Sequence, residues 1–184
     1  RILNHAYGKK TVSQMQAAAL IEPALDLTVK ADPAGWAQRL GGLLLPTGSV
    51  RLNNNGRITE IEGYESGAWW VQDAAAALPV KCLGDIRGLK VLDMCAAPGG
   101  KTAQLINGGA EVISLDISET RLKKLRDNMA RLQFSPPQTA CADGADYLQN
   151  CKSGQFDAIL LDAPCSATGT LRRHPELVHK NRSR

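Results

Sequence analysis

The segment from residue 89 to residue 116 constrains the fold of this chain more than any other. Apolar residues 91–94 are followed by a turn that ends in two glycines, a helical stretch after Gly100, a stop at residues 107–109 and a second apolar run at residues 112–116. A strand, a helix and a second strand in this order form a βαβ unit, in which both strands lie parallel in one sheet. The sequence therefore predicts an α/β protein with a doubly wound, Rossmann-like sheet.

Further strands extend this sheet, and smaller elements precede it. Residues 139–142 are typical of a short strand and residues 156–162 of a fully buried parallel strand. We therefore expect four strands, in the order 3-2-1-4 that is usual for a doubly wound sheet. Residues 23–86 predict a small α/β domain, and residues 1–22 predict a helix. Because the chain does not begin with Met and ends within a pattern, we expect a piece of a longer protein. Residues 1–22 would then end an upstream region, and residues 87–184 would be the N-terminal half of the doubly wound domain.

Local patterns give three more predictions. Residues 69–73 should lead into an alanine-rich helix. A helix capped by Ser118 should turn its basic residues to solvent, and these are Arg121, Lys123, Lys124, Arg126 and Arg131. Cys82, Cys141 and Cys151 should be small buried hydrophobes.

Composition excludes several classes of protein. A hydrophobic content of 43% is ordinary for a globular protein. The longest apolar stretch, residues 74–80, is too short to span a bilayer and no signal peptide is recognisable, so we expect a cytoplasmic protein without membrane contact. The five cysteines form no C-x-x-C pair and no zinc-type spacing, which predicts reduced thiols and no metal site.

Acidic residues occur at the ends of four successive predicted strands. Asp93, Asp116, Asp143 and Asp162 all lie in or just after a strand. Because ligands of open parallel sheets bind at the carboxyl ends of the strands, we expect these carboxylates to line one cleft. Asp116 is placed to accept hydrogen bonds from a ribose diol, of NAD or of another nucleoside cofactor. Asp143 either binds an adenine amino group or caps a helix.

The turn at residues 95–102 is the most specific local signal. Its small residues and paired glycines let backbone amides approach a ligand above the start of a helix. A dinucleotide fingerprint would need G-x-G-x-x-G, which is absent, and a Walker A loop would need glycine where this chain has Cys95. Each nucleotide-binding interpretation therefore lacks a glycine that its motif requires, and a methyl donor fits better.

Residues 162–169 indicate the class of reaction. Methyltransferases that modify exocyclic amino groups commonly carry an Asn/Asp-Pro-Pro-aromatic loop here, whereas this chain has Pro164 followed by Cys165. Carbon 5 of cytosine is too weak a nucleophile to take a methyl group unaided, so a thiolate must first add to carbon 6. A carboxyl group near ring N3, for which Asp162 is the candidate, would stabilise the adduct, and a base would later remove the carbon-5 proton.

The two motifs resemble the signatures of a known family. Residues 91–102 and 161–169 are similar to those of the RNA (cytosine-5) methyltransferases, and residues 70–73 and 172–175 favour the branch that modifies bacterial 16S ribosomal RNA. The resemblance covers roughly residues 23–176. It implies S-adenosyl-L-methionine as cofactor and ribosomal RNA as partner, and we expect the small upstream domain to be RRM-like.

The resemblance also implies roles for individual residues. The cofactor's methionine and ribose portions would be surrounded by Cys95, Ala96, Ala97, Pro98, Gly99, Gly100 and Lys101. Asp116 would bind the ribose hydroxyls, Asp143 the adenine, and Asp162 would lie beside both cofactor and target base. Cys165 would act in product release, because the covalent nucleophile of the family lies in a later Thr-Cys motif.

No Thr-Cys dipeptide occurs in this chain, so we predict that the chain alone does not turn over. Detectable methylation of RNA by this chain would instead indicate that Cys165 is the nucleophile. The basic residues that follow this motif are Arg172, Arg173, Lys180, Arg182 and Arg184, against Glu176 alone, so the net charge of +4 resides there. We expect Arg172 and Arg173 to bind RNA phosphates.

Three alternatives remain open from the sequence. A non-catalytic RNA-binding fragment would bind RNA without responding to S-adenosylmethionine. A nucleotide-dependent enzyme would bind NAD or ATP. A DNA cytosine methyltransferase would use a Pro-Cys nucleophile, although the turn at residues 95–102 resembles the RNA branch.

Overall fold

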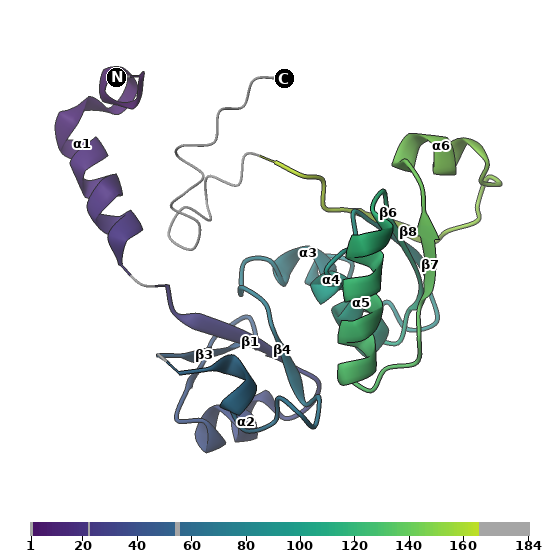
Figure 1. Ribbon diagram of the computed structural model, residues 1–184, viewed down its shortest axis with the longest axis horizontal. Coiled ribbons are helices and arrows are strands. Elements are labelled where there is room, and N and C mark those ends of the chain that lie inside the picture. The colour runs from purple at the N-terminus through teal and green to yellow at the C-terminus, as the bar shows by residue number, and fades with distance from the viewer. Residues whose placement is uncertain (1, 22, 54–55, 166–184) are drawn as a thin grey trace. The chain divides into compact units, whose positions relative to one another are not determined.

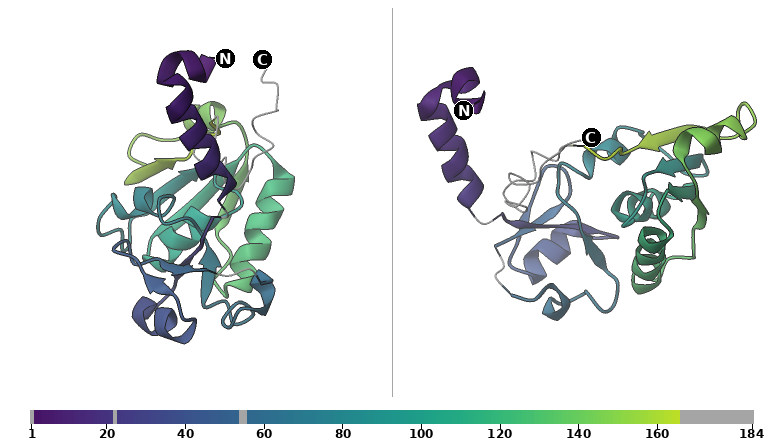
Figure 2. Two further views of the ribbon diagram at one scale, coloured as in Figure 1. Left: turned by 90° about the vertical axis from the view of Figure 1, so that its left-hand side faces the viewer. Right: turned by 45° about the horizontal axis from the view of Figure 1, so that its top comes forward.

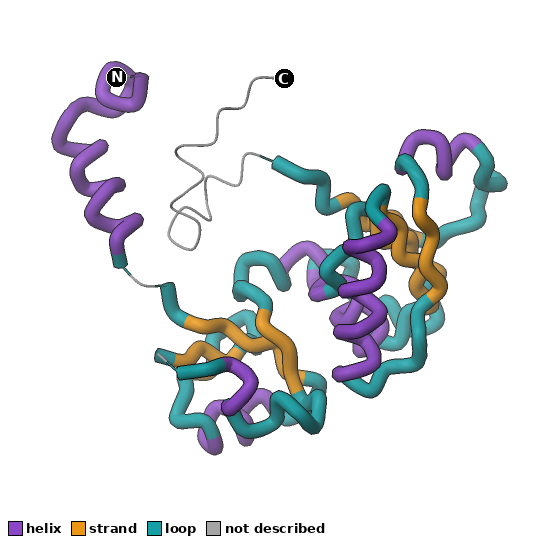
Figure 3. Tube along the Cα trace, viewed as in Figure 1, coloured by secondary structure: helices purple, strands orange, loops and turns teal. Residues whose placement is uncertain are grey.

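The computed structural model describes residues 2–21, 23–53 and 56–165, and the chain divides into two compact units (Figures 1 and 3). One unit is Leu25–Ala163, and the other comprises Arg1–Ala24 and Pro164–Arg184. The described part of the latter contains α1 (Ile2–Leu20), the helix expected near the N-terminus. This helix is interrupted at Gly8, whose φ of 77° and ψ of 154° are not helical.

The unit Leu25–Ala163 contains two sheets, and the first is antiparallel. Its strands follow the order β2-β3-β1-β4 and are β1 (Leu25–Val29), β2 (Leu43–Leu44), β3 (Val50–Leu52) and β4 (Trp69–Val71). The short helix α2 (Pro33–Arg39) is capped by Asp32, whose side chain accepts a hydrogen bond from the Gly35 N–H at 2.9 Å. A 3-10 turn, η1 (Ile58–Glu60), lies between β3 and β4.

Alternation along β1 gives this small sheet two different faces. Leu25, Leu27 and Val29 belong to an apolar cluster with residues of α2, so this face forms the core of the small domain. Asp26 and Thr28 lie on the opposite face, because successive side chains of a strand point to opposite sides. That second face therefore carries polar side chains into the rest of the unit.

The second sheet is parallel throughout. Its strands follow the order β7-β6-β5-β8 and are β5 (Lys90–Met94), β6 (Glu111–Asp116), β7 (Gln138–Cys141) and β8 (Ala158–Leu161). This is the predicted order 3-2-1-4. The strand order reverses at β5, because the chain moves outward through β6 and β7 and then returns to the other side of β5.

Helices cover the parallel sheet on both faces, as expected for a doubly wound domain (Figure 2). The helices α4 (Gly100–Asn107) and α5 (Glu119–Arg131) pack together in one cluster that includes Ala103 and Leu125. On the other face, Leu92 and Leu115 pack with Tyr147 of α6 (Gly144–Gln149). The predicted Rossmann-like architecture is thus confirmed for the described part of the chain.

Two predictions of local structure are wrong. The alanines after Asp73 form turns, and only a short helix, α3 (Leu78–Lys81), follows them. Pro79 explains this, because it lies in the first turn of α3, where its missing N–H leaves no bond unmade, whereas in a helix running through the alanines it could not donate to the carbonyl four residues earlier. β8 is not fully buried, since Ile159 and Leu161 are 48% and 60% exposed. β8 lies at an edge of the sheet built from the described strands, and no described helix covers these two side chains.

The cysteine prediction is also wrong. Cys82 and Cys141 are exposed, and Cys151 is only partly buried. Cys82 follows the short surface helix α3, and Cys141 ends the edge strand β7. A small apolar side chain at the end of a surface element has no neighbours to bury it, whatever its hydrophobicity.

Candidate functional site

The register of the parallel strands brings their carboxyl ends to one edge of the sheet. Met94 of β5 pairs with Leu115 of β6 and with Leu161 of β8, while Asp116 of β6 pairs with Cys141 of β7. Residues that directly follow these strands are therefore neighbours in space. The reversal of strand order at β5 makes this edge a topological switch point, which is where open parallel sheets bind their ligands.

The loop from β5 to α4 is held by backbone contacts and by glycine. Cys95 has a φ of 59°, and the Ala96 N–H donates to the carbonyl of Leu115 at 3.0 Å. Gly99, the N-cap of α4, has a φ of 103°, and a Cβ there would lie 2.9 Å from Cγ of Leu125, so only glycine fits. No side chain caps α4. Its first backbone N–H groups are therefore available to an anionic group of a ligand.

Asp93 is a fully buried carboxylate beneath this loop. Its Oδ2 accepts a hydrogen bond from Oγ1 of Thr102 at 2.6 Å, while its Oδ1 has no hydrogen-bond partner among the described residues. Burial raises the pKa of Asp93 to about 6, and Asp162 contributes to this rise, whereas the hydrogen bond from Thr102 and the charge of Lys101 oppose it. Because buried polar atoms are almost always hydrogen-bonded, Oδ1 is an acceptor that a ligand donor would satisfy.

Lys101 and Asp162 form an ion pair across the site. Nζ of Lys101 lies 2.6 Å from Oδ2 of Asp162. The lysine side chain is 13% exposed and the aspartate side chain 57% exposed, so the pair joins the buried loop to the open side of the cleft. Two predicted site residues are thus in direct contact, although 61 positions separate them in the chain.

Asp116 is buried at the end of β6 and is surrounded by donors. Its Oδ1 accepts from the backbone N–H of Ser118 at 3.0 Å, and its Oδ2 accepts from that of Ala97 at 3.3 Å. The guanidinium of Arg121 lies 3.1 Å from Oδ2 and also donates to the carbonyl of Ala97. Asp116 therefore fixes the loop from β5 to α4, and the prediction that Arg121 faces only solvent is wrong.

Arg131 also departs from the predicted solvated face of α5. Its guanidinium donates to the carbonyl of Tyr64 at 2.8 Å and lies 4.2 Å from the centre of the Tyr64 ring. This contact joins α5 to the segment between β3 and β4. Sequence spacing placed the basic residues on one face of the helix but could not reveal which of them meet a tertiary partner.

Asp143 caps α6. Its Oδ1 accepts from the backbone N–H groups of Ala145 and Asp146, at 2.8 and 3.3 Å. The helix-cap interpretation left open by the sequence is therefore correct, and adenine binding by the same residue stays a prediction.

The two motif cysteines differ in their surroundings. Burial raises the pKa of the Cys95 thiol, and the negative charge of Asp116 adds to this, so the thiolate needed for nucleophilic attack is disfavoured there. Cys165 is exposed and belongs to the other compact unit, so its relation to the cleft is not described. Arg172 and Arg173 lie outside the described residues.

A cavity of about 170 Å³ opens at this edge. It is lined by three groups of residues, namely Gln72, Asp73 and Ala76 after β4, the strand-end residues Asp93 and Asp162, and the loop residues Cys95, Ala96, Ala97, Pro98, Gly100 and Lys101. Most predicted cofactor residues are therefore gathered around one space. Gly99, Asp116 and Asp143 do not line it.

The wall formed by residues 72–76 was not predicted as part of the site. Gln72 and Asp73 directly follow β4, so their position after a strand was the signal that could have identified them.

Among the described residues no group of three His, Cys, Asp or Glu side chains could hold a metal ion, and no helix has the length and apolar character to cross a bilayer.

Comparison with known proteins bears on the identity of the chain. A family model described as 16S rRNA methyltransferase RsmB/F matches residues 82–184. The chain is 46% identical over 122 residues to ribosomal RNA small subunit methyltransferase B of Vibrio cholerae, a match covering 65% of this chain and 28% of the relative. It is 44% identical over 131 residues to the protein of that name from Serratia proteamaculans, covering 70% and 30%. This chain therefore spans less than a third of the length of these relatives.

Solved structures agree with the fold. A methyltransferase homologue from Pyrococcus horikoshii has 27% identity and a TM-score of 0.71, with 91% of this chain and 58% of that chain covered. NSun6 from the same organism, solved with SFG, has a TM-score of 0.72 at 17% identity, covering 90% and 69%, and supports the fold alone. Since the family model matches more than half of the residues, this chain belongs to the 16S rRNA methyltransferase RsmB/F family.

Proposed function

We propose that this chain carries the cofactor-binding part of an enzyme that methylates carbon 5 of a cytosine in small-subunit ribosomal RNA. The observation that carries the proposal is the cavity at the switch point beside β5. It combines the uncapped start of α4 with the unsatisfied, buried Oδ1 of Asp93. Membership of the RsmB/F family supports ribosomal RNA as the substrate.

The residues fit S-adenosylmethionine as cofactor. The free amides at the start of α4 suit its carboxylate, and the acidic walls of the cavity suit its positive charge. The cavity is smaller than the roughly 300 Å³ at which ordinary ligand pockets begin, so it suits one end of the molecule. Asp116 would bind the ribose hydroxyls and Asp143 the adenine. When bound, the cofactor supplies a methyl group attached to a positively charged sulfur.

Asp162 and Lys101 would prepare the target base. The 2.6 Å ion pair holds the carboxylate of Asp162 at the open side of the cleft, where it would accept a hydrogen bond from the N3–H of the cytosine ring once the thiolate has added to carbon 6. Cys165, three residues later, would act in product release. Because the chain has no Thr-Cys dipeptide, we expect no turnover by this chain alone.

RNA binding would involve both ends of the chain. Residues 23–86 would be a small RRM-like domain, for which the β2-β3-β1-β4 order and the single helix-covered face are the support. Residues 1–22 would end an upstream region, and residues 87–184 would be the first half of the methyltransferase domain. Arg172 and Arg173 would hold RNA phosphates next to the flipped-out target base.

Calorimetric titration with S-adenosylhomocysteine tests the cofactor assignment. We expect micromolar binding by the full chain and a loss of roughly tenfold or more in Asp116→Asn, because hydrogen bonds to a charged acceptor are among the stronger ones. Asp146→Asn is the matched control, since the exposed Asp146 does not line the cavity. Absence of binding to a demonstrably folded chain would overturn the cofactor assignment.

A further inference from the structure

The segment that follows β4 is built rigidly into the wall of the cofactor cavity. The side chain of Asp26, buried on β1, accepts two hydrogen bonds from Arg51, at 2.7 and 2.8 Å, and one from the backbone N–H of Ala74 at 3.0 Å. It therefore fixes the chain directly after Asp73. Asp73 lines the cavity and belongs to the small domain, whereas the other acidic residues of the cavity belong to the parallel sheet.

A hydrogen-bonded amide holds the other side of this segment. Gln72 is buried, and its Oε1 accepts from the indole N–H of Trp70 at 3.0 Å and from the hydroxyl of Thr28 at 2.9 Å. Its Nε2 donates to Oε1 of Gln104 in α4 at 3.2 Å. Residues 72 and 74 are thus both anchored, so the position of Asp73 relative to α4 is defined by its neighbours on each side.

The charged residues of the cavity do not balance. Three carboxylates line it, those of Asp73, Asp93 and Asp162, against the single cation Lys101. Lys101 is paired with Asp162. This lysine does not pair with Asp73 or Asp93. Asp73 also interacts electrostatically with Arg51, which does not line the cavity.

A second observation points from this acidic wall to a ligand. Oδ1 of the fully buried Asp93 has no hydrogen-bond partner among the described residues, and Asp93 lines the same cavity as Asp73. A buried carboxylate oxygen of this kind is expected to accept a hydrogen bond, and a cationic donor would also compensate its negative charge. The uncapped start of α4 offers backbone N–H groups to an anion beside it.

The order of groups along the sheet edge says which end of the cofactor meets this wall. Asp143 follows β7 and Asp116 ends β6, so adenine and ribose would lie at these two strands. The far end of the cofactor would then lie beyond them, at β5 and β8. That end is an α-amino acid, with an ammonium and a carboxylate on one carbon, which matches an acidic wall beside free helix amides.

We propose that Asp73, contributed by the small domain, is a cofactor-binding residue that recognises the α-ammonium group of S-adenosylmethionine together with Asp93. This proposal rests on the proposed function and deepens it. The small domain thereby completes the cofactor site, in addition to any contact it makes with RNA.

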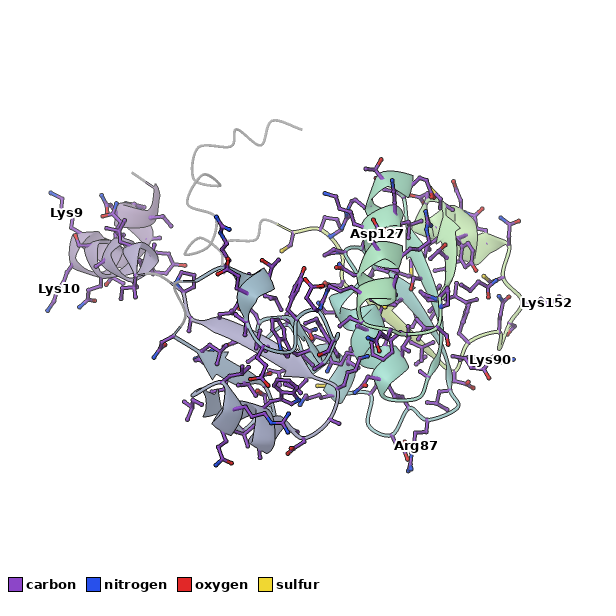
Figure 4. All side chains as sticks on the ribbon, turned by 60° about the horizontal axis from the view of Figure 1, so that its bottom comes forward. Lys9, Lys10, Arg87, Lys90, Asp127 and Lys152 are labelled. Carbon is purple, nitrogen blue, oxygen red and sulfur yellow. The ribbon has the colours of Figure 1, made fainter. Side chains whose placement is uncertain are left out.

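Binding of three ligands to Asp73→Asn tests the proposal. S-Adenosylmethionine and S-adenosylhomocysteine both carry the ammonium group, and only the former has a charged sulfur, while 5′-methylthioadenosine lacks the amino acid entirely. We expect the variant to bind the first two roughly tenfold more weakly and to bind methylthioadenosine unchanged. Asp127→Asn, which neutralises an exposed carboxylate on α5 labelled in Figure 4, is the matched control and should leave all three affinities unchanged.

Each other outcome overturns the proposal in a distinct way. An equal loss for all three ligands would mean that Asp73 only shapes the wall, and a loss for S-adenosylmethionine alone would mean that it recognises the sulfonium. Unchanged binding of every ligand would remove Asp73 from the site while leaving the proposed function intact. Failure of the unsubstituted chain to bind S-adenosylhomocysteine would overturn the proposed function as well. Thermal unfolding of Asp73→Asn, measured beside the parent, checks that the variant is folded under the conditions of the titrations.

Discussion

Replacing Asp93 with asparagine should stabilise the folded chain at neutral pH while weakening the cofactor site. Burial raises the pKa of Asp93 from 3.8 to about 6. The folded state therefore binds its proton more tightly than the unfolded state, and the contribution of this group to stability falls as the pH rises from about 4 through about 6. A tenfold change in a proton equilibrium corresponds to ~1.4 kcal/mol, so the ionised carboxylate destabilises the folded state by about 3 kcal/mol at pH 7.

Urea unfolding followed by tryptophan fluorescence between pH 4 and pH 8 measures this difference. Asparagine keeps an oxygen that can accept from Thr102 and removes the charge. We expect Asp93→Asn to exceed the parent by about 1–3 kcal/mol above pH 7, since part of the gain is lost to imperfect hydrogen bonding, and to equal it near pH 4. Asp127→Asn should show no such pH-dependent difference. A variant that is less stable than the parent at pH 7.5, or a difference that does not change with pH, would refute the reasoning.

Two further substitutions test the geometry of the loop. Gly99→Ala combines a φ of 103° with a Cβ 2.9 Å from Leu125, so it should reduce the free energy of unfolding by about 2–4 kcal/mol. Gly84→Ala, at a φ of 74° with open space around it, should reduce the free energy of unfolding by only about 1 kcal/mol. Equal losses in chemical denaturation would show that the contact with Leu125 is unimportant. Lys101→Met removes a charge that lowers the pKa of Asp93, so the pH midpoint of the stability profile should move upward, and a midpoint that stays in place would contradict that electrostatic coupling.

Much of the parallel sheet could be predicted because its information is local. Each strand is a short apolar run, and strands that alternate with helices are typical of a doubly wound sheet, whose usual order begins 3-2-1-4. The acidic residue at the end of β6 was predictable for a similar reason. Parallel strands bring their carboxyl ends to a common edge, whatever the details of their packing.

The rest depended on contacts between distant segments. The pairing of Arg121 with Asp116 and the contact of Arg131 with Tyr64 distinguish two basic residues from others that share their helix face. Periodicity alone gives all of them the same environment. The exposure of Leu161 likewise depends on which strands and helices lie beside β8, and a run of apolar letters does not contain that information.

The hydrogen bonds from Gln72 to Gln104 and from Ala74 to Asp26 have a consequence for exchanging parts between relatives. A chimera that joins the small sheet of one relative to the parallel sheet of another must choose a junction. A junction between β4 and α3 would separate the anchors of the cavity wall from the cavity itself. A junction after α3 would transfer the wall with its anchors on β1 and β3. Contacts with the parallel-sheet part, such as those of Gln72 with Gln104 and of Tyr64 with Arg131, would then need to match across species.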